Sequence, residues 1–316
     1  MISIAYNELD YLHNLDSHVE NSNRTKSIVS KLSSLFVDGK LKKERYKFFV
    51  AKSLDYSSEV WSIIFTVHNQ EYVEFLESKV SKVKKFDFLD PDTYVTPYTL
   101  KVILTNLNLL FSLCDCVIND GGFGFAYIRP PGHHAESSKA MGFCVINNVA
   151  VLARYIQLYH NLKKVMIVDF DAHHGNGTQE IFYDDDSVLY FSTHAYPFYP
   201  FTGLISEKGI GKGVGYTYNF PVSIYAGDNE LLKIYQNEFV SVYNNFAPDF
   251  VIVSSGYDIH SHDPITYMNC SINGINRIKD IILETVGYKR VIFVLEGGYN
   301  TNVLQEVVLY DINGIK

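Results

Sequence analysis

Positive charge is in short supply in this chain of 316 residues. Lys and Arg number 27 against 35 Asp and Glu, and the formal net charge at pH 7 is -8. Surfaces that bind DNA or RNA depend on clustered Lys and Arg to neutralise phosphates. We therefore expect no nucleic-acid partner, whereas a cationic substrate is weakly compatible with this charge.

Cysteine is scarce and is not spaced for a structural metal. The chain has four cysteines, Cys114, Cys116, Cys144 and Cys270. The first two form a CxC pattern rather than the CxxC of zinc ribbons. We expect buried free thiols in a reducing compartment.

Targeting segments, repeats and long apolar runs are not found either. The N-terminal MISIAYNELDYL has no basic stretch followed by an apolar core, so we expect no signal peptide. We expect no apolar run to be as long as the roughly 18 residues that a membrane span needs. We expect no membrane contact, a cytoplasmic location and one domain over residues 1–316.

Short apolar runs rich in β-branched and aromatic residues predict buried parallel strands at 164–170, 188–193, 250–256 and 291–298. One helical pattern, at 147–160, precedes the first run, and another, at 229–246, lies between the second and the third. Strands that alternate with helices predict an α/β fold, with a parallel sheet covered on both faces.

Each predicted strand ends in polar or glycine-rich residues, namely DFDAHHGNG, STH, SSGYDIHSHD and LEGGYN. In open parallel sheets, ligands bind beyond the carboxyl ends of the strands. We therefore expect these four clusters to meet at one edge of the sheet.

The first cluster suggests a metal site. Asp169, Asp171 and His173 would share one side if the strand geometry continued through them. Carboxylate and imidazole ligands suit zinc, and Asp258 is the best candidate for a third ligand. Three ligands leave positions for water and substrate, as in catalytic zinc sites. Taken singly, each residue is more often a helix cap or a satisfied polar group.

The segment RPPGHHAE places His133 and His134 side by side after a stiff Pro-Pro-Gly turn. Two imidazoles on a rigid loop suit proton transfer near neutral pH, with Asp169 and Asn176 available to fix their tautomers. A surface loop with incidental histidines is the alternative. Tyr299 follows two glycines at a strand end, where a phenol is able to donate to a developing oxyanion.

Together, these segments resemble the zinc-dependent histone deacetylase superfamily, which includes acetylpolyamine amidohydrolases and class II-type lysine deacetylases. The similarity extends over most of the chain and includes HVENSNR, DPDTYVTP, GFAYIRPPGHHAE, GFCVINNVA, IVDFDAHHGNGTQEIF, FYPFTG, SSGYDIHSHDP and LEGGYN. It implies an arginase-like α/β fold, with about eight parallel strands and helices on both faces.

The resemblance also implies roles for the site residues. The zinc ligands would be Asp171, His173 and Asp258. The general base and acid would be His134, with His133 as its electrostatic partner. Asp169 would orient His133, Asn176 would face His134, and Tyr299 would polarise the acetyl carbonyl.

Two further sets follow from the resemblance alone. The walls of a narrow lysine channel would be formed by Gly142, Phe143 and Tyr199. A potassium ion would be bound by the Ser192 hydroxyl and by backbone oxygens of Asp169, Asp171, His173 and Thr193.

The expected substrate is an acetylated lysine in a peptide or protein, from which acetate is released. Relatives that act on polyamines tend to carry an acidic residue just after the DP that follows the zinc aspartate, and this chain has Ile265 there. Asp92 would lie at the rim, where it would orient a peptide backbone or a cationic group. An acetylpolyamine is therefore the alternative substrate.

Two other classes of function are weighed. A non-catalytic reader of acyl-lysine would tolerate the loss of Tyr299 or of a zinc ligand, yet all these positions are filled. An arginase-like ureohydrolase would need further aspartates for a second metal, and DAHHGNG has none two residues after His173.

Overall fold

The computed structural model describes residues 1–37 and 45–315. Its main sheet has eight strands in the order β2-β1-β5-β10-β9-β6-β7-β8, and every neighbouring pair is parallel. The strands are β1 Ile2–Asn7, β2 Tyr46–Ala51, β5 Phe123–Tyr127, β6 Val165–Asp169, β7 Val188–Ala195, β8 Thr217–Val222, β9 Phe250–Ser255 and β10 Val291–Leu295. A separate antiparallel pair is formed by β3 Asp87–Phe88 and β4 Tyr94–Val95.

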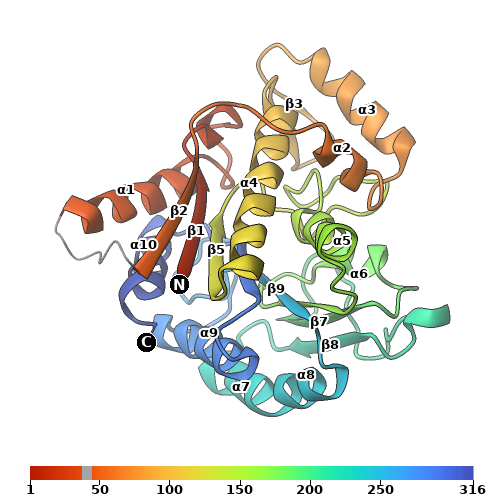
Figure 1. The fold of residues 1–316 in the computed structure, drawn as a ribbon, viewed down its shortest axis with the longest axis vertical. Coiled ribbons are helices and arrows are strands. Elements are labelled where there is room, and N and C mark those ends of the chain that lie inside the picture. The colour runs from red at the N-terminus through yellow and green to blue at the C-terminus, as the bar shows by residue number, and fades with distance from the viewer. Residues whose placement is uncertain (38–44, 316) are drawn as a thin grey trace.

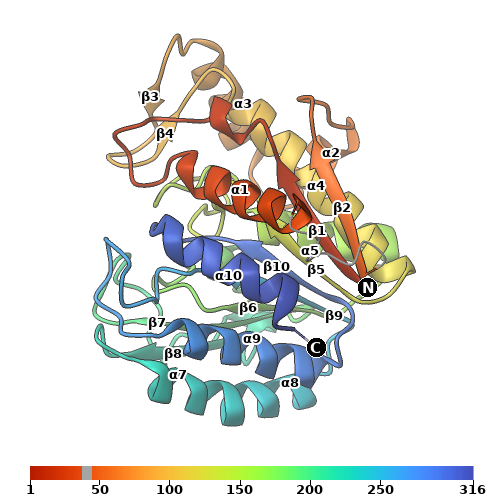
Figure 2. The ribbon, with the colours of Figure 1, turned by 90° about the vertical axis from the view of Figure 1, so that its left-hand side faces the viewer.

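Helices cover both faces of the main sheet (Figure 1). One layer consists of α1 Asn23–Val37, α7 Asp228–Ile234, α8 Val240–Phe246, α9 Ile272–Val286 and α10 Thr301–Asn313, and Figure 2 shows α1, α10, α9 and α7 stacked along it. The other consists of α2 Glu59–Ile64, α3 Gln70–Ser81, α4 Thr99–Asn119, α5 Asn148–His160 and α6 Asn176–Ile181. Short helical turns lie at Asp10–Leu12, Gly211–Gly213 and Tyr235–Phe239.

The α/β fold with a parallel sheet and two helical layers is therefore confirmed. The four predicted strands correspond to β6, β7, β9 and β10, and the helical pattern at 147–160 corresponds to α5. The pattern at 229–246 covers α7 and α8, which a π-helical turn connects. All four cysteines are buried free thiols, as expected.

The expectation that no apolar run reaches the length of a membrane span is wrong for α4. This helix has 21 residues and a mean hydropathy of 1.6, so it is long and apolar enough by length and composition. However, 72% of the apolar window is buried inside the protein, where α4 packs on β1 and β5. A helix that is apolar on most sides fits an interior position in a layered fold.

The register of the sheet determines which loops meet. Asp169 at the end of β6 is aligned with Ser192 on β7 and with Ser254 on β9. Because these neighbours are parallel, the loops that follow them leave the sheet at the same edge.

Candidate active site

The loops after β6 and β9 bring two carboxylates to one imidazole. His173 Nδ1 lies 2.9 Å from Asp258 Oδ2 and 3.1 Å from Asp171 Oδ1. The potential ligand atoms of these three residues all lie within 4.8 Å of one another. The structure thus groups the three predicted zinc ligands.

The strand geometry that was expected to align Asp169 with Asp171 does not continue past β6, which ends at Asp169. Asp169 instead directs Oδ2 toward His133 Nδ1, at 3.1 Å, and accepts a hydrogen bond from the Tyr190 hydroxyl at 3.0 Å. Its position agrees with the predicted orienting role rather than with a place among the metal ligands.

The donor set fits a divalent metal cation. Burial disfavours a charged His173, but Asp171 and Asp258 outweigh it and raise the pKa of His173 to about 10. A position that stabilises a proton so strongly also favours a metal ion bound by nitrogen and oxygen ligands. The second carboxylate oxygens are fixed by main-chain N–H groups, since Gly297 donates to Asp171 and Ala172 donates to Asp258.

His134 is held in one tautomer by an amide. The Asn176 side-chain nitrogen donates to Glu136 at 2.8 Å, so the amide oxygen faces His134 Nδ1, also at 2.8 Å. Nδ1 therefore carries the hydrogen, and Nε2 is left with a free lone pair. Burial and the neighbouring His133 lower the pKa of His134 well below its usual value, which keeps this ring neutral and able to accept a proton.

His133 has the opposite character. Burial disfavours its charge, but the carboxylates of Asp171 and Asp169 outweigh that effect and raise its pKa to about 10. The two rings lie 4.1 Å apart between centroids. The pair therefore consists of a charged imidazolium beside a neutral base, which is the arrangement that separates acid and base roles in an active site.

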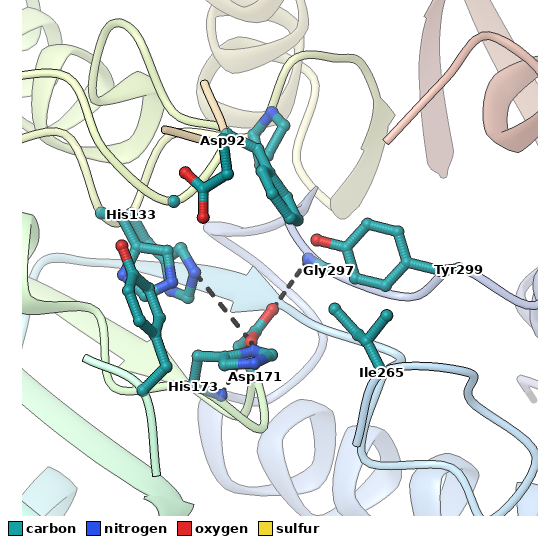
Figure 3. A pocket seen from close by; sticks show the side chains of 12 residues that line it. Asp92, His133, Asp171, His173, Ile265, Gly297 and Tyr299 are labelled. Atoms are coloured by element: carbon teal, nitrogen blue, oxygen red, sulfur yellow. Dashed lines mark hydrogen bonds and ion pairs between the residues drawn. The ribbon is translucent and has the colours of Figure 1, made fainter. Parts of the chain in front are cut away.

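A pocket opens above these residues, as Figure 3 shows. The residues that were predicted from the sequence and that line it are Asp92, His133, His134, Gly142, Phe143, Asp171, His173, Tyr199, Ile265 and Tyr299. The Phe143 ring meets the Tyr299 ring at 5.8 Å, and the Tyr199 ring meets that of His134 at 5.3 Å. The lining also includes Pro131 and Gly297, which the sequence analysis did not single out as site residues.

Comparison with known proteins agrees with this geometry. The histone deacetylase domain matches residues 18–315. The chain belongs to the histone deacetylase family. It is 35% identical over 310 residues to histone deacetylase 10, chloroplastic, of Oryza sativa subsp. japonica. This alignment covers 94% of this chain and 69% of the relative. It is also 36% identical over 266 residues to a probable deacetylase of Archaeoglobus fulgidus. This alignment covers 80% of this chain and 73% of the relative.

A solved structure shows the same fold. The crystal structure of the HDA15 HD domain superposes with a TM-score of 0.88 at 31% sequence identity and covers 99% of this chain and 89% of that one. The eight-stranded sheet and its two helical layers are thus those of the histone deacetylase family.

In this member of the histone deacetylase family, Tyr299 directs its hydroxyl into the pocket (Figure 3). Burial raises the pKa of Tyr299 well above its usual value, so the phenol keeps its proton and remains a donor. The guanidinium of Arg24 lies 4.8 Å from the centre of the Tyr299 ring, and Arg24 Nε donates to the Gly298 carbonyl at 2.7 Å. Arg24 is part of the HVENSNR segment, but nothing local in the sequence indicates that it reaches Tyr299.

Two of the predicted potassium ligands, Ser192 and Thr193, are neighbours on β7. Ser192 is aligned with Asp169 in the sheet, and its hydroxyl lies 2.8 Å from His194 Nδ1. Thr193 is the next residue on β7, and its hydroxyl lies 3.1 Å from that of Tyr235. Potassium binding stays a prediction.

Proposed function

We propose that this chain is a zinc-dependent lysine deacetylase that hydrolyses the amide of an acetylated lysine side chain and releases acetate. The observation that supports this most is the pocket itself. Two of the three potential ligands, the neutral imidazole and the phenol donor line one cavity at the carboxyl edge of the sheet, and the third ligand, Asp258, lies directly behind them against His173. Metal-assisted amide hydrolysis uses a group of each kind, since water must be activated, its proton accepted and the oxyanion stabilised.

The residues that would hold zinc are Asp171, His173 and Asp258. Zinc at this position would polarise the amide carbonyl and lower the pKa of a water molecule toward 7. Three protein ligands leave room for that water and for the substrate oxygen.

The protein groups around the metal ligands would move the protons. His134 would accept a proton from the attacking water at Nε2, since Nδ1 already donates to Asn176. Tyr299 would donate a hydrogen bond to the carbonyl oxygen as negative charge develops on it. His134 or His133 would then donate a proton to the leaving amine, and the amine and acetate would depart.

The lining of the pocket favours an acylated amine over a free one. Phe143, Tyr199 and Ile265 provide apolar wall, and burying an unpaired ammonium group there would cost several kcal/mol. A neutral amide of lysine carries no such cost. Ile265 offers no carboxylate to a second amine, which favours acetyl-lysine over an acetylpolyamine.

An acetylpolyamine is the second candidate substrate, and Asp92 is the observation that favours it. Asp92 lines the same pocket and is only partly buried, so its carboxylate is able to meet a cationic group. The same carboxylate would also accept hydrogen bonds from the backbone of a peptide substrate.

Acetate release from an acetyl-lysine peptide and from an acetylated polyamine, measured with the zinc-loaded protein, tests the proposal. Faster release from the peptide is the expected result. Faster release from the polyamine would keep the mechanism and overturn the substrate. No release from either would overturn the proposed activity and favour a non-catalytic reader of acyl-lysine.

Two further parts of the proposal concern potassium, which rests on the family resemblance, and the location of the protein. Potassium would be held near the zinc site by Ser192, Thr193 and the backbone oxygens of the loop after β6. The cytoplasm is the expected location, although the rice relative is chloroplastic by name.

A further inference from the structure

Asp263 is a buried acid to which the proposed reaction gives no task. It lies in the loop after β9, where the adjacent His262 and Pro264 are exposed, yet only 8% of its own surface is accessible. A carboxylate that is withdrawn from water needs hydrogen bonds to offset the lost hydration. The partners of Asp263 therefore indicate what its burial achieves.

The two oxygens of Asp263 accept hydrogen bonds from two separate segments of the pocket wall. Oδ2 accepts from the main-chain N–H of Tyr299 at 2.8 Å, and Oδ1 accepts from the main-chain N–H of Ile265 at 3.0 Å. Both partner side chains line the pocket, and Figure 3 shows them on the same side of it. One carboxylate thus connects the phenol donor to the neighbouring channel wall.

The residues on either side of Tyr299 also form hydrogen bonds to other segments. The Gly298 carbonyl accepts from Arg24 Nε at 2.7 Å, and the Asn300 side chain donates to the His262 carbonyl at 2.8 Å. Gly298 has a φ of 106°, a conformation that glycine adopts easily and leaves easily. Without such bonds the Gly298–Tyr299 segment would have several accessible conformations.

We propose that Asp263 is a positioning residue, which acts through the backbone of Tyr299 to place the phenol hydroxyl at the reacting carbonyl. The inference rests on the proposed function, because only that function gives the hydroxyl a task. Donors to a developing oxyanion act at about 2.7–3.1 Å, and a displacement of about 1 Å costs roughly a hundredfold in rate. A bond to the Tyr299 N–H is well placed to prevent such a displacement.

The test is a double-mutant cycle of Asp263→Asn and Tyr299→Phe. An asparagine has nearly the same size but only one acceptor oxygen, so it is able to hold one of the two N–H groups and not both. Asp263→Asn alone should lower kcat about tenfold, with a smaller change in KM, as expected for a misplaced transition-state donor. In the Tyr299→Phe background the same change should lower kcat less than about twofold, because the hydroxyl is already gone.

Asp228→Asn is the matched control. Asp228 also joins two segments, since it accepts from the Ser271 N–H at 2.7 Å and from the Ser271 hydroxyl at 2.6 Å, but it does not line the pocket. This control should leave kcat and KM unchanged. Zinc content should equal that of the wild type in every variant of the cycle.

An equal loss of kcat from Asp263→Asn in both backgrounds, or no loss in the wild-type background, would overturn the proposal. If Asp263→Asn fails to fold, amide hydrogen exchange of the wild-type protein decides instead. The main-chain amides of Tyr299 and Ile265 should be protected, and rapid exchange at both would overturn the inference. This measurement uses no substrate, so it is separate from a failure of the proposed activity, which the lack of acetate release by the wild type would reveal.

Discussion

At Tyr299 the hydroxyl is the only group that a phenylalanine would lack. The ring would keep its contacts with Arg24 and Phe143, so Tyr299→Phe should not disturb the fold. Removing one oxyanion donor usually lowers kcat by about 100- to 1000-fold, and we expect a loss in that range. Steady-state turnover and zinc content measure the two effects. Unchanged turnover would remove Tyr299 from the mechanism.

Gly297 is a residue at which a single added methyl group should strongly weaken metal binding. A Cβ atom there would lie 2.5 Å from Asp171 Oδ2 and 2.5 Å from Asp258 Oδ2, so both carboxylates would have to move. We expect Gly297→Ala to lose most of its bound zinc, measured by elemental analysis after dialysis. Gly227→Ala is the control, because its nearest contact is 3.1 Å from the Asn269 carbonyl oxygen. Full zinc occupancy in Gly297→Ala would argue against these two ligands.

At the scale of elements, the loop between β7 and β8 contains Tyr199, which lines the pocket, and the carboxylate of Glu207 holds this loop in place by hydrogen bonds. Glu207 accepts from the main-chain N–H groups of Gly203 and Leu204, both at 3.1 Å, and from the side chain of Gln179 on α6 at 2.6 Å. Bonds to an ionised acceptor are worth about 1.5–3 kcal/mol each, so their loss should loosen the loop.

Glu207→Gln should therefore raise KM several-fold, with a smaller change in kcat, because the wall that contacts the substrate moves while the proton-transfer groups stay in place. Steady-state kinetics on the preferred substrate measures this. Glu77→Gln, at an exposed position on α3, is the control. A fall in kcat with KM unchanged would show that the loop supports the chemistry rather than the wall.

Elements were predictable from sequence where an apolar run is continuous. β6, β9 and β10 have every residue buried, and their VMIVD, FVIVSS and VIFVL sequences indicate strands directly. β5 and β8 were not singled out, because Gly124 interrupts one run and Pro221 the other. Proline is tolerated in β8 since that strand is at the edge of the sheet.

The candidate site was predictable as a set of motifs, but its supporting contacts were not. The metal and histidine motifs sit at strand ends, and parallel topology brings strand ends together. Arg24 contacts the Gly298 carbonyl across most of the chain, and Asp263 contacts the Tyr299 N–H from another loop. Such pairings depend on the direction in which each side chain points in the folded protein. The spacing of residues in the sequence does not reveal that direction.

At the scale of the whole molecule, Glu20 should make stability sensitive to acid. Glu20 is fully buried, and although burial raises its pKa, Arg129 and Arg24 outweigh that effect and lower it to about 2. The Arg129 guanidinium bonds both of its carboxylate oxygens, at 2.7 and 2.6 Å. Since the unfolded value is near 4.5, this stabilisation is complete above that pH and is lost as the pH falls toward 2.

Glu20→Gln should lower the free energy of unfolding at pH 7 by about 3–5 kcal/mol, because Arg129 would be left buried without its partner. The difference from wild type should shrink between pH 4.5 and pH 3. Urea unfolding at several pH values measures both effects. Asp120→Asn breaks an exposed pair with Lys47 and should change stability by less than about 1 kcal/mol. A pH-independent difference for Glu20→Gln would contradict the linkage.

The position of β10 in the sheet has a consequence for how the chain is made. β10 is the last of the described strands along the chain, yet it lies between β5 and β9 and pairs with both. Until residues 291–295 leave the ribosome, β2-β1-β5 and β9-β6-β7-β8 are two separate part-sheets, each with an open edge. Open edges on a nascent chain invite pairing with other chains. During translation, this protein should depend on chaperones until residues 291–295 have been made and have paired with β5 and β9.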